Sequence, residues 1–271
     1  MLAAPDWQED SPSPPPPPKK LSLAPGQLPA AVEAMLWRGT DFGNPVRSSI
    51  ATGWDALDRD LPGAGWPCHS LTEILSPQPS VLEWRLLGPA LRQVIAKGQQ
   101  VVVVAPPRHP HLPGLRHEGI DDRSLVWIRA ETPAERLWVT EQLIKANAAG
   151  ALLAWLPQAR AEQLRRLQVA AQGCDGPVFL IRPQQAQYEA SPAPLRVQAT
   201  FGLDWELCLR ILKRRGPVCD TLLMLPSIPG GLASVLTPRL RTPSRLIHRE
   251  APDVVGSPVA PARPRRHASA H

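Results

Sequence analysis

The chain has 271 residues, of which 43% are hydrophobic and 20% are charged, so it can form the core of one large domain or two small ones. No run of residues approaches the ~18 apolar positions that a membrane-spanning helix needs, and the opening MLAAPDWQED has acids where a secretory signal would be apolar. The four cysteines are scattered without a CxxC pair, which favours reduced thiols over a disulfide scaffold or a zinc finger. We therefore expect a cytoplasmic protein with no membrane contact and no metal.

The N-terminal end is rich in proline, of which the chain has 34 residues. The run SPSPPPPP at 11–18 can form neither helix nor sheet, so we predict a disordered lead over 1–26. Residues 27–47 are expected to hold a short helix and a connector. The helix spans 28–38, LPAAVEAMLWR, with Leu28, Ala31 and Met35 on one side and Gly39 as its stop.

From 48 to 228 the pattern alternates between short apolar runs and helical periodicity. We predict strands at 71–75, 100–105, 125–128, 151–156 and 177–181, with helices at 81–97, 132–147 and 158–172 between them. Strands that alternate with helices indicate an α/β fold, a doubly wound and mostly parallel sheet. Three further runs, 195–200, 205–213 and 218–225, follow one another without helices. We predict that they form an antiparallel C-terminal extension, with the basic turn Lys213-Arg214-Arg215-Gly216 between the last two.

A doubly wound sheet often binds nucleotide at the loop after its first strand. Here that loop is Ser76, Pro77, Gln78, Pro79, Ser80, Val81, Leu82 and Glu83. The segment 51–80, ATGWDALDRDLPGAGWPCHSLTEILSPQPS, resembles the opening of the RecA-type recombinase core, and the likeness runs with gaps to residue 217. The resemblance implies a RecA-like fold whose phosphate loop is at 76–83.

The phosphate-binding residues of such a loop are missing. A working loop reads GxxxxGK[ST], with glycines around the phosphates, a lysine on the β/γ-phosphates and a hydroxyl on Mg²⁺. Ser76 and Val81 stand in place of the glycines, Leu82 in place of the lysine and Glu83 in place of the hydroxyl. The strand that should end in a metal-directing acid has Ala154 or Trp155 there, and the strand that should end in the catalytic glutamate reads VVVVAPP. We expect no ATP hydrolysis, no catalytic residue and no cofactor, because phosphoryl transfer depends on those groups.

The degenerate loop, the helix ending in LWR and the turn Gly65-Trp66-Pro67 together resemble the ImuA family, SOS-induced accessory proteins of mutagenic translesion synthesis. The resemblance implies a non-catalytic scaffold in DNA repair and the DNA damage response. It implies three partners: the polymerase-like protein ImuB, an error-prone C-family polymerase subunit, and RecA. Its N-terminal helix is the candidate partner-binding segment, through Leu28, Met35, Leu36, Trp37 and Arg38.

Two other functions stay open. The first is a SulA-like cell-division inhibitor, which also lacks nucleotide chemistry but is usually shorter. The second is a nucleotide-dependent recombinase with an unusual loop, against which Leu82 and Glu83 weigh heavily.

The C-terminal tail, 229–271, is basic and rich in proline and arginine, and we predict disorder from about residue 237. The net charge of the chain is 30 − 24 = +6, and residues 237–271 carry seven arginines and two acids, or +5. A DNA-binding arm, a segment that folds on an acidic partner, and a solubilising tail all fit this composition. The arginines are Arg239, Arg241, Arg245, Arg249, Arg263, Arg265 and Arg266.

Two smaller groups of residues favour structural roles. His109, His111 and His117 lie in a proline-broken segment without a fourth ligand, so we predict a solvated loop and no zinc. Of the nine tryptophans, Trp84, Trp127 and Trp138 fall within predicted elements, which favours core packing.

Overall fold

The structure, a computed structural model, describes residues 48–79, 82–229 and 232–244. The predicted lead at 1–26, the helix and connector at 27–47, and the tail from 245 onward lie outside these residues, so the structure tests none of them. Among the described residues no helix is long and apolar enough to cross a membrane.

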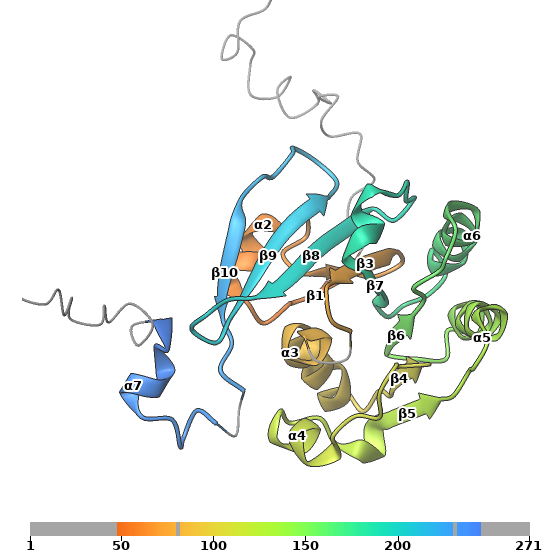
Figure 1. The fold of residues 1–271 in the computed structure, drawn as a ribbon. Helices are drawn as coiled ribbons and strands as arrows, with labels where there is room; N and C mark the ends of the chain where they lie inside the picture. The colour runs from red at the N-terminus through yellow and green to blue at the C-terminus, as the bar shows by residue number, and fades with distance from the viewer. Residues whose placement is uncertain (1–47, 80–81, 230–231, 245–271) are drawn as a thin grey trace, which may run out of the picture. The chain divides into compact units, whose positions relative to one another are not determined.

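An eight-stranded sheet has the order β10-β9-β8-β3-β7-β6-β4-β5, and a separate two-stranded sheet pairs β1 with β2 (Figure 1). The strands are β1 (Ser49–Ile50), β2 (Trp66–Pro67), β3 (Leu71–Ser76), β4 (Val101–Val104), β5 (Leu125–Ile128), β6 (Ala151–Trp155), β7 (Val178–Pro183), β8 (Leu195–Phe201), β9 (Glu206–Lys213) and β10 (Leu222–Pro226). The helices are α2 (Asp55–Asp60), α3 (Leu82–Ala96), α4 (Leu112–His117), α5 (Pro133–Lys145), α6 (Ala161–Ala171) and α7 (Pro238–Arg241), with 3₁₀ turns η2 (Asp122–Ser124) and η3 (Gln184–Tyr188).

The mixed α/β architecture and the mostly parallel sheet are confirmed. The strands β3, β4, β5, β6 and β7 pair in parallel, and β9 and β10 add in antiparallel fashion. One part of the predicted extension is wrong: β8 pairs in parallel with β3 and antiparallel with β9. The extension therefore begins to run antiparallel only at β9.

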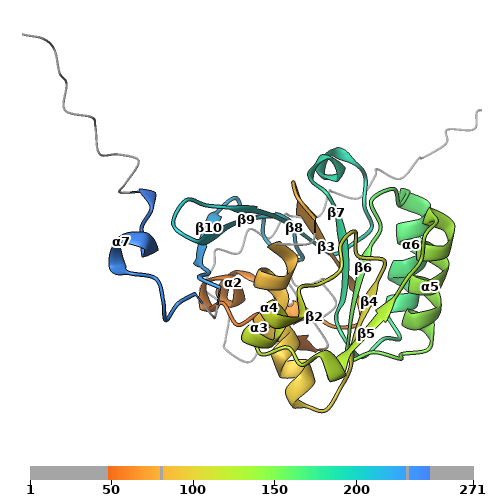
Figure 2. The same ribbon diagram turned by 60° about the horizontal axis from the view of Figure 1, so that its bottom comes forward.

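Helices cover both faces of the sheet, and each face has its own apolar core. One core joins the buried side of α3 to Leu57 of α2, Leu115 of α4 and alternate residues of the strands. The other joins α5 and α6 to the opposite side chains of β4, β6 and β7. Figure 2 shows α5 and α6 side by side on one face, and α2, α3 and α4 on the other. The four valines of β4 are buried on both faces, which explains their unbroken apolar run.

Three short elements differ from the sequence prediction. The segment with His109, His111 and His117 was expected to be a loop, yet residues 112–117 form α4. The six residues of α2 were not predicted either. Disorder from about residue 237 is wrong for the described part of the tail, where α7 spans Pro238–Arg241. All three helices are too short to show a helical repeat of apolar residues.

Candidate functional site

The predicted phosphate-loop segment connects the central strand β3 to α3, at the carboxyl end of the parallel strands. Ser76 is the last residue of β3 and is buried, whereas Pro77, Gln78 and Pro79 are exposed. Ser80 and Val81 lie outside the described residues. The segment thus occupies the place where an open α/β sheet binds ligands.

Leu82 and Glu83 are both buried where α3 begins. Leu82, at the lysine position, is 1% exposed and belongs to the apolar core on the α3 face of the sheet. Glu83, at the hydroxyl position, is fully buried, and the Ser76 hydroxyl donates a 3.4 Å hydrogen bond to its Oε1. A carboxylate in the first turn of a helix interacts favourably with the helix dipole. The chain therefore places its own carboxyl group at the start of the helix, where a phosphate loop would receive a phosphate group.

Aromatic side chains fill the neighbouring space at the end of β6. The sequence left open whether Ala154 or Trp155 occupies the position of the metal-directing acid. Ala154 belongs to the core on the α5 and α6 face, whereas Trp155 belongs to the core on the α3 face. The Trp155 ring packs against that of Trp84 at a centroid distance of 6.3 Å and a tilt of 37°. Trp155 therefore occupies the side of the sheet on which α3 and its first turn lie.

Arg85 follows these residues on α3, but its guanidinium group is engaged elsewhere. Its Nη2 donates to the Trp205 carbonyl at 2.9 Å and its Nε donates to the Ser227 hydroxyl at 3.1 Å. The guanidinium carbon also lies 5.1 Å from the centre of the Phe201 ring. Burial lowers the pKa of Arg85 from its ordinary value. An arginine side chain nevertheless stays charged in proteins. This cation holds the extension strands against α3.

A buried ionic cluster joins β3, β7 and β8 beneath the same edge of the sheet. Glu73 of β3 is fully buried, with its Oε1 3.2 Å from Arg182 Nη1 and its Oε2 2.5 Å from Arg196 Nε. Arg182 also pairs with Glu189 at 2.6 Å, and Arg196 donates to the Ala186 carbonyl at 2.6 Å. Charges this deeply buried need such partners. The cluster fixes η3 over the central strands, and the sequence signal that could have revealed it is the charged residue inside the apolar run LTEILS.

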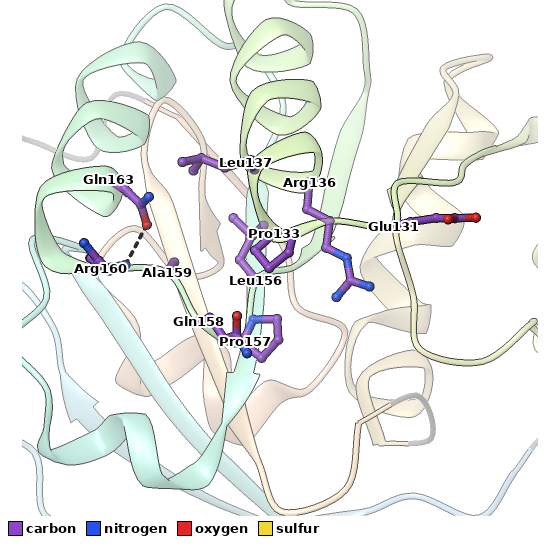
Figure 3. Close-up of a pocket in the computed structure, with 11 residues that line it drawn as sticks. Glu131, Pro133, Arg136, Leu137, Leu156, Pro157, Gln158, Ala159, Arg160 and Gln163 are labelled. Atoms are coloured by element: carbon purple, nitrogen blue, oxygen red, sulfur yellow. Dashed lines mark hydrogen bonds between the residues drawn. The ribbon is translucent and has the colours of Figure 1, made fainter.

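A cavity of about 630 Å³ opens between the starts of α5 and α6 (Figure 3). Arg136, Arg160 and Glu131 contribute charged groups to its lining, and Leu137 and Leu156 contribute apolar ones. Arg136 Nε is tied to the Ala130 carbonyl at 3.0 Å. The backbone N–H of Arg160 donates to Gln163 Oε1 at 2.9 Å, which caps α6. No local pattern in the sequence indicates a site at these residues.

The histidines have structural roles. His111 Nδ1 accepts a 3.1 Å hydrogen bond from the backbone N–H of Gly114 and so caps α4, and the His109 ring stacks 5.1 Å from that of Trp127. No cluster of three or more metal-ligating side chains occurs in the described ranges. Trp84 is buried and Trp127 is half-buried, but the core prediction for Trp138 is wrong, because 62% of its surface is exposed.

The first part of the basic tail contacts the turn between β8 and β9. Trp205 Nε1 donates to the Leu240 carbonyl at 2.9 Å, and the Asp204 carboxylate accepts hydrogen bonds from the backbone N–H of Ser244 at 2.7 Å and its hydroxyl at 2.6 Å. Arg241 bonds to carbonyls within the tail itself, and Arg239 lies beside it in α7. The other five candidate arginines of the tail (Arg245, Arg249, Arg263, Arg265 and Arg266) lie outside the described residues, as do Leu28, Met35, Leu36, Trp37 and Arg38.

No protein-family model matches the chain, and no curated protein matches it. The assignment of function therefore depends on the site geometry and on the motifs in the sequence.

Proposed function

We propose that this chain is a RecA-like protein that has lost its phosphate-loop chemistry and acts as a non-catalytic scaffold. The coarse architecture supports this: a mostly parallel sheet has a central strand, β3, whose following loop leads directly into α3. The motifs in 51–80 and the GWP turn add the resemblance to the ImuA family. The proposed role is that of an accessory protein in SOS-induced mutagenic translesion synthesis.

The observation that carries the proposal is the burial of Leu82 and Glu83. The lysine of a phosphate loop must point away from the core to reach the β- and γ-phosphates. Leu82 instead packs into the apolar core, and the carboxyl group of Glu83 is buried at the start of α3. A nucleotide would therefore meet no cation from these two positions, and neither side chain is exposed to bind phosphate or Mg²⁺. The two residues thus support protein recognition over ATP chemistry.

The proposed partners are those of the ImuA family: an ImuB-like polymerase-family protein, an error-prone C-family polymerase subunit, and RecA. The N-terminal segment 28–38 is the proposed contact for a protein partner. The basic tail is the proposed contact for DNA or for an acidic partner, since a run of arginines attracts phosphates and carboxylates alike.

Affinity capture from DNA-damaged cells tests this function. The full chain is compared with variants that lack 1–38 or 237–271, and the captured proteins are identified by mass spectrometry. We expect the full chain to capture a polymerase-like protein and RecA. We expect one of the two deletion variants to fail to capture a given partner. Capture of a cell-division protein without any polymerase would overturn the proposal and favour the SulA-like function.

A nucleotide assay provides the second arm of the same test. The purified full chain is expected to show no binding of a fluorescent ATP analogue and no ATP turnover, with or without single-stranded DNA. Turnover that depends on DNA would show instead that the protein is a recombinase with an unusual loop.

A further inference from the structure

The strand β10 is a free edge of the sheet and carries no charge. Among the described residues it is the last strand in the order and pairs with β9 alone. Its sequence, LLMLP, exposes 52% of Leu222 and 43% of Met224. Natural proteins usually protect such edges with charged side chains, proline, bulges or a covering element, because exposed backbone groups invite a further strand. β10 has one of these features, Pro226 at its last residue.

The opposite edge of the sheet, β5, is better covered. All four residues of β5 are half-buried, and the ring of Trp127 is covered by His109. In Figure 1 the helix α2 lies behind β9 and β10. On the other face of these strands Leu222, Met224 and Arg210 are exposed. The apolar edge at β10 is therefore the less protected of the two.

The strand register shows what fits against β10. On that exposed face Leu222 lies opposite Arg210 of β9, Met224 opposite Cys208, and Pro226 opposite Glu206. An antiparallel pairing of β10 with itself, centred on Met224, puts Leu222 beside Pro226 of a second copy. Each such row of side chains then runs across both copies: Arg210 and Leu222 of one copy, followed by Pro226 and Glu206 of the second copy. The row has an apolar centre and opposite charges at its two ends. Two-fold symmetry produces this row twice.

The charges in these rows are available for such a contact. Among the described residues, neither Arg210 nor Glu206 forms a salt bridge. Their backbones would be three strand spacings apart, about 14 Å, and both side chains are long enough to shorten that separation over the apolar centre. The charges therefore favour the antiparallel register and add only modest affinity.

We propose that a second copy of this chain binds here, so that two β10 strands pair antiparallel and join two sheets into one. The inference is independent of the proposed function. A contact built on one short strand falls below the size of a standard interface, so the dimer dissociates at low protein concentration. We expect a dissociation constant in the micromolar range, on the order of 10 µM.

Sedimentation velocity of the full chain between about 1 and 100 µM, a range that brackets that constant, tests the proposal. Wild type is expected to shift from monomer to dimer over this range. Met224→Lys puts two cations side by side at the symmetry centre, and we expect it to stay monomeric. Val218→Lys is the matched control: Val218 is 95% exposed in the β9–β10 connection, outside the paired strand, so this variant should dimerise like wild type.

A charge swap separates loss of pairing from loss of folding. Arg210→Glu should weaken the dimer several-fold, and the double variant Arg210→Glu/Glu206→Arg should restore it, because the rows regain opposite charges. A circular dichroism spectrum of each variant checks the fold. A wild-type chain that stays monomeric at all concentrations, or a folded Met224→Lys that dimerises like wild type, would overturn the proposal.

Discussion

Leu82 decides whether the loop after β3 can be returned to phosphate binding by one substitution. Its side chain is 1% exposed and surrounded by apolar residues of the core. We expect Leu82→Lys to lower the free energy of unfolding by about 3 kcal/mol or more, because an ammonium group would be buried without a partner. It should gain no affinity for ATP. Urea denaturation and titration with a fluorescent ATP analogue measure the two effects.

The control for Leu82→Lys is Gln78→Lys, which adds the same charge in the exposed part of the loop. Its stability should match that of wild type. A folded Leu82→Lys protein that bound the analogue would contradict our interpretation, since it would mean that the lysine can leave the core and reach a phosphate.

Glu73 is the residue on which the ionic cluster depends. Its carboxylate alone faces both Arg182 and Arg196, whose side chains are almost fully buried. Glu73→Gln should cost about 3–5 kcal/mol of unfolding free energy, because two guanidinium groups would lose their buried counter-charge. Glu189→Gln should cost less than about 1 kcal/mol, since Glu189 is 55% exposed and Arg182 keeps Glu73. Equal costs for the two variants in denaturant unfolding would contradict this ranking.

At the scale of elements, an acid in α5 makes stability depend on pH. Lys145 and Arg166 each hold a Glu141 oxygen at 2.8 Å, and the hydrogen bond from Lys145 is the main cause of the lowered pKa of this carboxyl. A lowered pKa in the folded state gives stability that is present above the ordinary value of 4.5 and lost as the pH falls through the folded value.

Glu141→Gln should therefore be less stable than wild type above pH 5, and the difference should shrink towards pH 3. Thermal unfolding across that range measures the difference. Glu162→Gln is the matched control, because Glu162 is an exposed carboxylate on α6. If the stability difference between Glu141→Gln and wild type stayed constant with pH, the ion pairs of Glu141 could not be its cause.

The order of the long elements could be predicted from the sequence, because their residues follow a local period. The bounds of β5 were predicted as found. In the structure Thr132 caps the start of α5 and forms a capping box with Glu135. The six-residue α4 could not be predicted, since Pro113 and Gly114 interrupt it and the cap is a histidine. The ionic partners of Glu73 are more than a hundred residues away in the chain, so no local pattern could have shown them.

Exposure was the other limit of sequence reasoning. Trp138 has the position of a helix residue and the chemistry of a core residue, yet α5 turns it to solvent. Periodicity assigns a side chain to a face of a helix, but only packing decides which face is covered.

At the scale of the whole molecule, two contacts attach the start of the basic tail to the turn between β8 and β9. The Asp204 carboxylate accepts two hydrogen bonds from Ser244, one from its backbone N–H and one from its hydroxyl. Trp205 holds Leu240 through a separate bond, so the tail is attached at two points on the same turn. The segment between them contains Arg241, a cleavage site for trypsin.

Asp204→Ala should speed tryptic cleavage after Arg241, because the segment must open locally before a protease can bind it, and each 1.4 kcal/mol of lost attachment raises the open population about tenfold. Fragment masses over a digestion time course measure the rate. Asp220→Ala, in the exposed connection between β9 and β10, removes the same charge without touching the tail and should leave the rate unchanged. Equal rates for both variants would show that the Asp204 contact does not hold the tail. Faster cleavage in Asp204→Ala alone would show that this contact keeps the segment around Arg241 closed to a protease.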